Sequence, residues 1–145
     1  MRLVIQTVKK AELSVDHTIK ATISHGAIVY VGFSEFDTEA TMQSLIDKLV
    51  HLRIYPDEFG KTNLSIQAIE GSILFVPNFT LYADVSGSRR PSFSNALSPH
   101  LAESLFSKLL DYAKSVYPNI YHGVFGAHMH IDVTHHGPFT MVLEA

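Results

Sequence analysis

The stretch Gly123-Val-Phe-Gly-Ala-His-Met-His-Ile-Asp-Val-Thr-His-His-Gly-Pro-Phe-Thr140 reads as a strand, a sharp turn and the start of a second strand. Apolar residues alternate with polar ones over 129–133, which is the period of a half-buried strand. The run His-His-Gly-Pro at 135–138 breaks this ladder, because proline has no amide donor and glycine adopts angles that other residues avoid. The apolar run 139–143 resumes the sheet. A Gly-Pro step between strands predicts either a tight hairpin turn or a rigid main-chain wedge that inspects a small ligand.

Size and composition limit the class of protein. The chain has 145 residues, of which 46% are hydrophobic and 17% charged, so we expect one compact domain over residues 1–145. The net charge of −3 provides no global basic field, so any contact with RNA must be local. The absence of cysteine excludes disulfides and thiol chemistry. No apolar run approaches the roughly 20 residues that span a bilayer, and the N-terminal segment is unlike a secretory signal. We therefore expect a cytoplasmic protein that does not interact with membranes.

Hydrophobic periodicity predicts two helices among many strands. Strands are expected at 3–8, 13–23 with a turn at 16–17, 27–33, 53–55, 65–69 and 73–82. One helix begins at Asp37 or Thr38 and runs to about Leu52. The other begins at Ser98-Pro99 and ends before Pro118, with Leu101, Leu105 and Leu109 in its buried stripe. Because helices and strands do not alternate strictly, we expect an α+β fold with the helices packed on a curved sheet.

Histidines crowd the C-terminal fifth of the chain, which raises the possibility of a metal site. His128, His130 and Asp132 alternate along one strand and therefore share a face. Residues two apart on a strand, about 7 Å, could reach one ion, but residues four apart, about 13 Å, suit a tetrahedral site poorly. A metal would thus need ligands from elsewhere or from a partner chain, and a histidine-dependent metal protein is the less favoured alternative.

Two further patterns could take part in chemistry or binding. Thr80 follows a strand interrupted by proline, and a histidine could in principle activate its hydroxyl. No Gly-x-Ser-x-Gly elbow accompanies it, so the alternative is an ordinary strand residue. Lys61, Arg89 and Arg90 lie in predicted loops near the aromatic Phe93 and could contact RNA, although basic loops are often merely solvated.

Four ordered motifs together resemble the D-aminoacyl-tRNA deacylase family. They are Phe79-Thr-Leu-Tyr-Ala-Asp84, Gly87-x-Arg-Arg-Pro-Ser-Phe93, Gly123-x-Phe-Gly-Ala-x-Met129 and Gly137-Pro-x-Thr140. The resemblance covers the whole chain and implies a curved, barrel-like mixed β-sheet with two main helices. It also implies an esterase without a cofactor that hydrolyses D-aminoacyl-tRNA, and glycyl-tRNA mischarged on tRNA(Ala), as chiral proofreading in translation.

The same resemblance implies a homodimer with active sites at its interface. The Gly-Pro pair, in a cis bond, would enter the partner's pocket and leave no room for the side chain of an L-residue. Family mechanisms invoke either the threonine or the substrate's ribose 2′-hydroxyl, which positions water beside backbone donors; we expect the second, because nothing in the sequence activates the threonine. The implied site residues are Asn78, Phe79 and Thr80 for catalysis, Gly137, Pro138 and Thr140 from the partner subunit for chiral selection, Phe125, Ala127 and Met129 for the substrate pocket, and Lys61, Arg89 and Arg90 for the 3′ end of the tRNA.

Four positions depart from the family's pattern. Pro77-Asn78 stands where the family usually has Ser-Gln, and His135 stands where it has asparagine. Thr7 replaces an arginine that supports the Gly-Pro loop across the interface. With proline at position 77, the chain also resembles an animal relative of the family. In that relative the Gly-Pro bond is trans, and the protein removes a misplaced L-alanine. The alternatives are therefore a relative that binds tRNA without D-specific turnover, or one that edits an L-amino acid.

Overall fold

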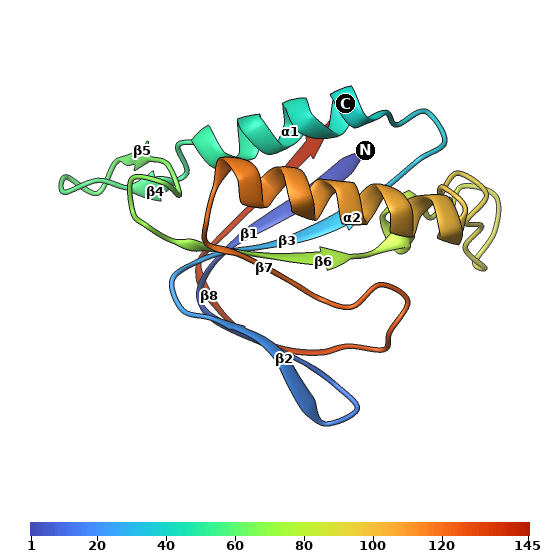
Figure 1. The fold of residues 1–145 in the computed structure, drawn as a ribbon, viewed down its shortest axis with the longest axis horizontal. Helices are drawn as coiled ribbons and strands as arrows, with labels where there is room; N and C mark the ends of the chain where they lie inside the picture. Colours follow the sequence, from blue (N-terminus) through green and yellow to red (C-terminus); the bar gives the residue numbers. More distant parts are fainter.

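One long strand organises the sheet of the computed structural model, which describes residues 1–145 apart from the side chain of Pro138. Strand β1 (Arg2–Val15) pairs antiparallel with β3 (Gly26–Gly32) along its first half and with β2 (Thr18–Ile23) along its second half. Strand β8 (His130–Glu144) pairs with both halves of β1 along its other edge. Because β1 changes partner midway, the sheet curves around it (Figure 1).

Two helices cross between parallel strands on one side of this sheet. Strand β3 runs parallel to β6 (Ser72–Pro77), and β6 runs parallel to β7 (Ile120–His122). Helix α1 (Glu39–His51) lies in the first crossover and helix α2 (Pro99–Val116) in the second, and the two helices lie side by side (Figure 1). The predicted α+β fold, a curved, barrel-like mixed sheet with two main helices, is confirmed.

Shorter elements lie at the two ends of the molecule. Strands β4 (Tyr55–Pro56) and β5 (Thr62–Leu64) form a small hairpin at one end. The 3₁₀ helix η1 (Phe79–Tyr82) and the loop 83–98 lie at the opposite end (Figure 1). No helix among the described residues is both long and apolar enough to cross a membrane.

The sheet buries side chains on both faces. On one face, α1 and α2 pack their apolar stripes against β1, β3 and β6. On the other face, the second half of β1 and strand β2 fold over β3 and β6 to form a smaller core. This smaller core consists of Val8, Ala11, Leu13, Ala21, Ile23, Ile28, Leu74 and Val76.

The local rules for helix ends and turns predict several boundaries correctly. Thr38 caps α1, with its hydroxyl accepting from the N–H of Thr41. Ser98 precedes α2 and Pro99 is its first residue. The turn at Asp16 and His17, both with positive φ, joins β1 to β2 as predicted.

The predicted gap between the strands 3–8 and 13–23 is wrong, because β1 runs unbroken from Arg2 to Val15. Three other predicted strands are wrong or too long. Residues 65–69 form a helical turn, because Ser65 accepts the N–H of Ala68 at its hydroxyl and that of Ile69 at its carbonyl. The predicted strand 53–55 is replaced by the two-residue β4 at Tyr55–Pro56. The strand from 73 ends at Pro77, and η1 follows it instead of further strand.

Leu101 was expected in the buried stripe of α2 but is 57% exposed. Ala102, the next residue on the same turn, is only 6% exposed, so the buried stripe of α2 begins at Ala102 and Leu101 faces away from it. Leu105 and Leu109, on the following turns, are buried as predicted.

Candidate active site

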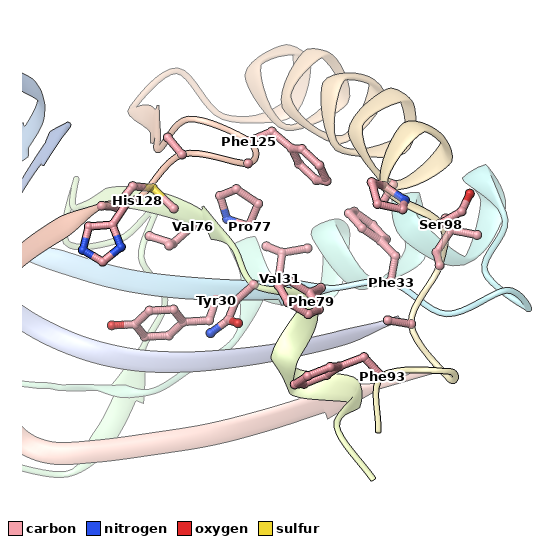
Figure 2. A pocket seen from close by; sticks show the side chains of 18 of the residues that line it. Tyr30, Val31, Phe33, Val76, Pro77, Phe79, Phe93, Ser98, Phe125 and His128 are labelled. Carbon is pink, nitrogen blue, oxygen red and sulfur yellow. The ribbon is translucent and has the colours of Figure 1, made fainter. Parts of the chain in front are cut away.

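A cavity of about 630 Å³ opens where the parallel strands β3 and β6 end. Ligand sites in such sheets form at the carboxyl ends of parallel strands, since the loops that follow them meet there. Figure 2 shows Phe33, Pro77 and Phe125 around this cavity beneath α2. The lining residues are Tyr30, Val31, Phe33, Val76, Pro77, Asn78, Phe79, Phe93, Ala96, Leu97, Ser98, Pro99, Ala102, Phe125, Gly126, Ala127, His128, Met129 and Ile131.

The segment between β7 and β8 forms one wall of the cavity. The ring of Phe125 lies 6.2 Å from that of Phe106 on α2, which fixes its position under the helix. Gly126 has a φ of 72°, a turn conformation that glycine adopts without strain. A Cβ atom on Gly123 would lie 2.6 Å from the sulfur of Met129, so the glycine leaves room for the Met129 side chain to close this wall.

Asn78 builds the opposite wall by capping η1. Its main-chain N–H donates to the carbonyl of Val31 at 2.7 Å, which ties η1 to β3. Its side-chain oxygen accepts from the N–H of Thr80 at 3.2 Å and from the Thr80 hydroxyl at 2.5 Å. A Cβ atom on Gly32 would lie 3.0 Å from the Cβ of Leu81, so the glycine lets η1 pack closely on β3.

These bonds decide which donors of η1 are available to a ligand. The Thr80 hydroxyl donates a hydrogen bond to an amide oxygen. Because an amide oxygen is not a base, the hydroxyl is not activated as a nucleophile. The N–H of Thr80 is also occupied. The N–H of Phe79 has no hydrogen-bond partner among the described residues and is free to donate to a bound carbonyl oxygen.

The cavity offers apolar surface and almost no charge. None of the lining residues is an aspartate, glutamate, lysine, arginine or cysteine. Burial raises the pKa of Tyr30, so its hydroxyl is neutral at physiological pH. The site therefore lacks a carboxylate pair for acid–base chemistry, and His128 is its one imidazole. Main-chain donors and groups of the substrate are the other polar groups that a reaction here can use.

An aromatic pair lies at the cavity beside a loop that bears two arginines. Phe79 and Phe93 meet edge to face, with ring centroids 5.0 Å apart, and both are partly exposed. Asp84 and Ser92 exchange two main-chain hydrogen bonds of 2.8 and 2.9 Å, which close the neck of the loop between them. Arg89 and Arg90 are therefore held on a closed, exposed loop whose base adjoins the cavity.

The Gly-Pro step lies in a bulge of one strand. The prediction of a turn between two strands is wrong, because β8 continues through it and both halves pair with β1 in the same direction. The register shifts between Gln6 and Val8 of β1, so the bulge takes up the extra residues. Gly137 has a φ of 129°, which non-glycine residues rarely adopt.

The model of the D-Tyr-tRNA(Tyr) deacylase family matches residues 4–144. The chain belongs to this family. A protein of Aquifex aeolicus named D-aminoacyl-tRNA deacylase is 40% identical over 145 residues, which are 100% of this chain and 98% of that protein. Another of the same name from Syntrophomonas wolfei is 41% identical over 145 residues, 100% of this chain and 97% of that protein.

Two solved structures share the deacylase fold. The structure titled "c-Myc DNA Unwinding Element Binding Protein" has a TM-score of 0.95 and 31% identity, and the match covers 100% of this chain and 99% of that one. The structure titled "Structural Analysis of a probable eukaryotic D-amino acid tRNA deacylase" has a TM-score of 0.86. Its identity is 18%, with 98% and 97% of the two chains covered, so this likeness concerns the fold alone.

The structure brings together some of the site residues that the family resemblance implies and leaves others apart. Asn78, Phe79, Phe125, Ala127 and Met129 line one cavity, while the adjacent Thr80 does not line it. Neither Gly137 nor Thr140 lines the cavity of its own chain. Lys61 lies on the β4–β5 hairpin, at the opposite end of the molecule from Arg89 and Arg90 (Figure 1). The contact of Pro138 involves a side chain outside the described part of the structure and stays a prediction.

Sequence reasoning missed several lining residues from other elements. Tyr30 and Phe33 belong to β3 and the residues after it, and Leu97 and Ala102 come from the approach to α2. Phe33 could have been found, because it is the last residue of the predicted strand 27–33 and so lies at the edge where such strands end. Leu97 and Ala102 carry no comparable signal in the sequence.

The histidines of the C-terminal fifth do not form a metal site among the described residues. The rings of His128 and His130 lie edge to face, with centroids 5.2 Å apart. No group of three or more potential metal ligands gathers around them or elsewhere in the described part of the chain. His128 instead lines the cavity.

Proposed function

We propose that the chain hydrolyses the ester bond of D-aminoacyl-tRNA and releases the free D-amino acid and tRNA, as chiral proofreading in translation. The observation that carries this proposal is the uncharged cavity, with a free main-chain N–H of Phe79 beside apolar walls. Relatives of the same length that carry the name D-aminoacyl-tRNA deacylase support it. Glycyl-tRNA mischarged on tRNA(Ala) is a second substrate, because glycine also lacks an L side chain.

The chemistry uses the substrate's own groups. The ester carbonyl lies against η1, and the N–H of Phe79 donates to its oxygen as negative charge develops. The ribose 2′-hydroxyl positions the attacking water. The oxygen of this water bonds to the carbonyl carbon, the bond from that carbon to the ribose oxygen breaks, and a proton passes to the ribose oxygen. Asn78 acts as a positioning residue, since its side chain holds η1 in shape.

Discrimination between the two hands of the amino acid requires a second subunit. In a twofold homodimer, the bulge at Gly137, Pro138 and Thr140 of one chain reaches the cavity of its partner, and the reverse holds for the second site. Main-chain atoms at the bulge then occupy the space that an L side chain would need. That neither Gly137 nor Thr140 lines the cavity of its own chain supports this arrangement.

The arginine loop holds the end of the tRNA. Arg89 and Arg90 donate to phosphates, which fixes the position of the substrate without reading its sequence. The pair Phe79 and Phe93 offers partly exposed aromatic surface nearby for a nucleobase. Lys61, at the β4–β5 hairpin on the opposite end of the molecule, would contact a different part of the tRNA. Such an enzyme acts in the cytoplasm, where translation takes place.

Hydrolysis of matched substrates tests the proposal. The purified protein is incubated with D-tyrosyl-tRNA, L-tyrosyl-tRNA and glycyl-tRNA, and the release of labelled amino acid is followed over time. We expect release from the D-tyrosyl and glycyl substrates and none from the L-substrate. Release from the L-substrate alone would identify an editor of L-amino acids. Pro77 is the residue that raises this alternative, because it is shared with the relative that removes L-alanine.

Binding without turnover is the second candidate function. It is favoured by the changes at Thr7, Pro77, Asn78 and His135 and by the relative of 31% identity that is titled a DNA-unwinding-element binding protein. Single-turnover assays with enzyme in excess separate the two functions. Retention of uncleaved D-tyrosyl-tRNA on the protein would select binding and exclude the esterase.

A further inference from the structure

Thr7 is one of the few buried polar side chains, and its hydroxyl is directed at the bulge of β8. The side chain is 4% exposed. Its hydroxyl donates to the main-chain carbonyl of His136 at 2.6 Å. A hydrogen bond shielded from water in this way is stronger than one on the surface.

The register of β1 and β8 leaves Thr7 alone opposite the bulge. Gln6 pairs with Thr140 and Val8 pairs with His135, so the four residues 136–139 of β8 face the single residue Thr7 of β1. Within the described residues, the Thr7 hydroxyl makes the only side-chain hydrogen bond to the main chain of 136–139. The pairs on either side fix the ends of the bulge but not its middle.

One hydrogen bond at this carbonyl orients a whole peptide unit. The carbonyl of His136 and the N–H of Gly137 belong to the same rigid plane. Fixing the carbonyl therefore restrains the peptide unit on the N-terminal side of Gly137, a residue whose φ of 129° lies in a region that glycine adopts readily.

The ring of the same residue makes a second contact. The ring of His25, in the turn before β3, lies 6.4 Å from the ring of His136 and packs edge to face on Tyr55 at 5.7 Å. His136 is thus held by its carbonyl and by its ring. The ring contact limits where the residue lies, and only the hydroxyl of Thr7 specifies how its peptide plane is turned.

We propose that Thr7 is a positioning residue for D-selectivity: its hydroxyl fixes the peptide plane between His136 and Gly137, and with it the main-chain surface that excludes L-aminoacyl groups. The inference rests on the proposed function, in which this bulge selects the hand of the amino acid. In this proposal, the hydrogen bond between Thr7 and His136 of one subunit restrains the bulge that the same subunit presents to the cavity of its partner.

Two substitutions separate the effect of the Thr7 hydroxyl from the effect of the side chain's volume. Thr7→Val keeps the volume and removes the donor, while Thr7→Ser keeps the donor. We expect Thr7→Val to lower the ratio of kcat/KM for D-tyrosyl-tRNA over L-tyrosyl-tRNA by about tenfold, the loss of one buried hydrogen bond. The order parameter of the Gly137 amide should fall from about 0.85 toward 0.6, and Thr7→Ser should resemble the wild type in both measurements.

A core variant controls for a general loss of stability. Ile28→Val shortens a buried side chain of β3 and should lower the melting temperature while leaving both the Gly137 order parameter and the selectivity unchanged. If Thr7→Val does not fold, Thr7→Ala takes its place in the same comparison.

The outcomes distinguish this inference from the proposed function. A wild type that discriminates D from L, together with a Thr7→Val variant unchanged in selectivity and in order parameter, overturns the role of Thr7 alone. Loss of selectivity in Thr7→Ser as well as Thr7→Val overturns the role of the hydroxyl. Failure of the wild type to hydrolyse D-tyrosyl-tRNA overturns the proposed function, whatever the variants do.

Discussion

The hydroxyl of Thr80 is committed to a hydrogen bond inside η1. It donates to the side-chain oxygen of Asn78, the same atom that accepts the N–H of Thr80. A nucleophilic hydroxyl needs the reverse arrangement, in which a base accepts its proton. A single atom of Asn78 thus supports the structure of η1 and leaves Thr80 unactivated.

We therefore expect Thr80→Ala to keep substantial activity. The substitution removes one of the two bonds to Asn78 and leaves the free N–H of Phe79 in place, so kcat/KM for D-tyrosyl-tRNA should fall by less than about tenfold. Single-turnover hydrolysis rates measure this. A loss of several thousandfold would instead assign Thr80 a covalent or general-base role.

At the scale of elements, α2 both stabilises the fold and shapes the cavity. Its buried stripe packs against the sheet, and Phe106 on this stripe holds Phe125 in the cavity wall. The first turn of α2 supplies Pro99 and Ala102 to the lining. Stability and site geometry should therefore respond to different turns of the same helix.

Two leucines of α2 provide a matched comparison. Leu109→Ala removes a side chain that is fully buried and should lower the free energy of unfolding by about 2–5 kcal/mol. Leu101→Ala, eight residues earlier in the same helix, changes an exposed side chain and should stay within about 0.5 kcal/mol. Urea unfolding followed by circular dichroism measures both, and equal losses would contradict the placement of Leu101.

The arginine loop should respond to acid through Asp84. Hydrogen bonds from Ser86 hold the pKa of the Asp84 carboxyl below its usual range. Because the folded pKa is depressed, the carboxylate's contribution is present at neutral pH and is lost as the pH falls through the folded pKa. We expect the carboxyl ¹³C signal of Asp84 to titrate below about 3.9, together with the amide of Ser86. In Asp84→Asn the Ser86 amide should no longer titrate, and a midpoint above 3.9 would contradict the hydrogen bond.

At the scale of the whole molecule, the proposed dimer divides each active site between two chains. One variant, Ala127→Phe, fills the cavity of its own subunit and leaves the bulge intact. Another, Gly137→Ala, places a Cβ atom 2.8 Å from the main-chain nitrogen of Phe139 and distorts the bulge, leaving the cavity intact. Each homodimer should lose activity toward D-tyrosyl-tRNA.

Mixing the two inactive variants should restore activity. After unfolding and refolding together in equal amounts, about half of the dimers are mixed, and each mixed dimer has one intact cavity facing one intact bulge. We expect about a quarter of wild-type activity, measured as the initial rate of D-tyrosyl-tRNA hydrolysis. No recovery in dimers shown to be mixed by mass spectrometry would mean that each chain builds its site alone. Gly60→Ala, a glycine of positive φ on the distant β4–β5 hairpin, controls for backbone strain and should leave activity unchanged.

The sequence by itself determined the features that depend on neighbouring residues. The cap at Thr38, the start of α2 at Ser98-Pro99, the period of the helices and the turn at 16–17 were predictable, because each follows from interactions within a few residues. The side chain of Ser98 makes no capping hydrogen bond. The four motifs likewise predicted the family over the whole chain. Four residues that these motifs contain and that were expected in the site, Phe79, Phe125, Ala127 and Met129, line the cavity.

Only the tertiary structure decided how distant segments meet. Phe33 and Phe125 are brought to one cavity by the parallel pairing of β3, β6 and β7, which no local pattern encodes. The expected hairpin at Gly137 became a bulge because both halves of β8 pair with one strand from the other end of the chain. Thr7 and His136 are separated by 129 positions, so their hydrogen bond exists only once β1 and β8 have paired. Pairing over such separations depends on the packing of the whole sheet, and that is where this site acquires its shape.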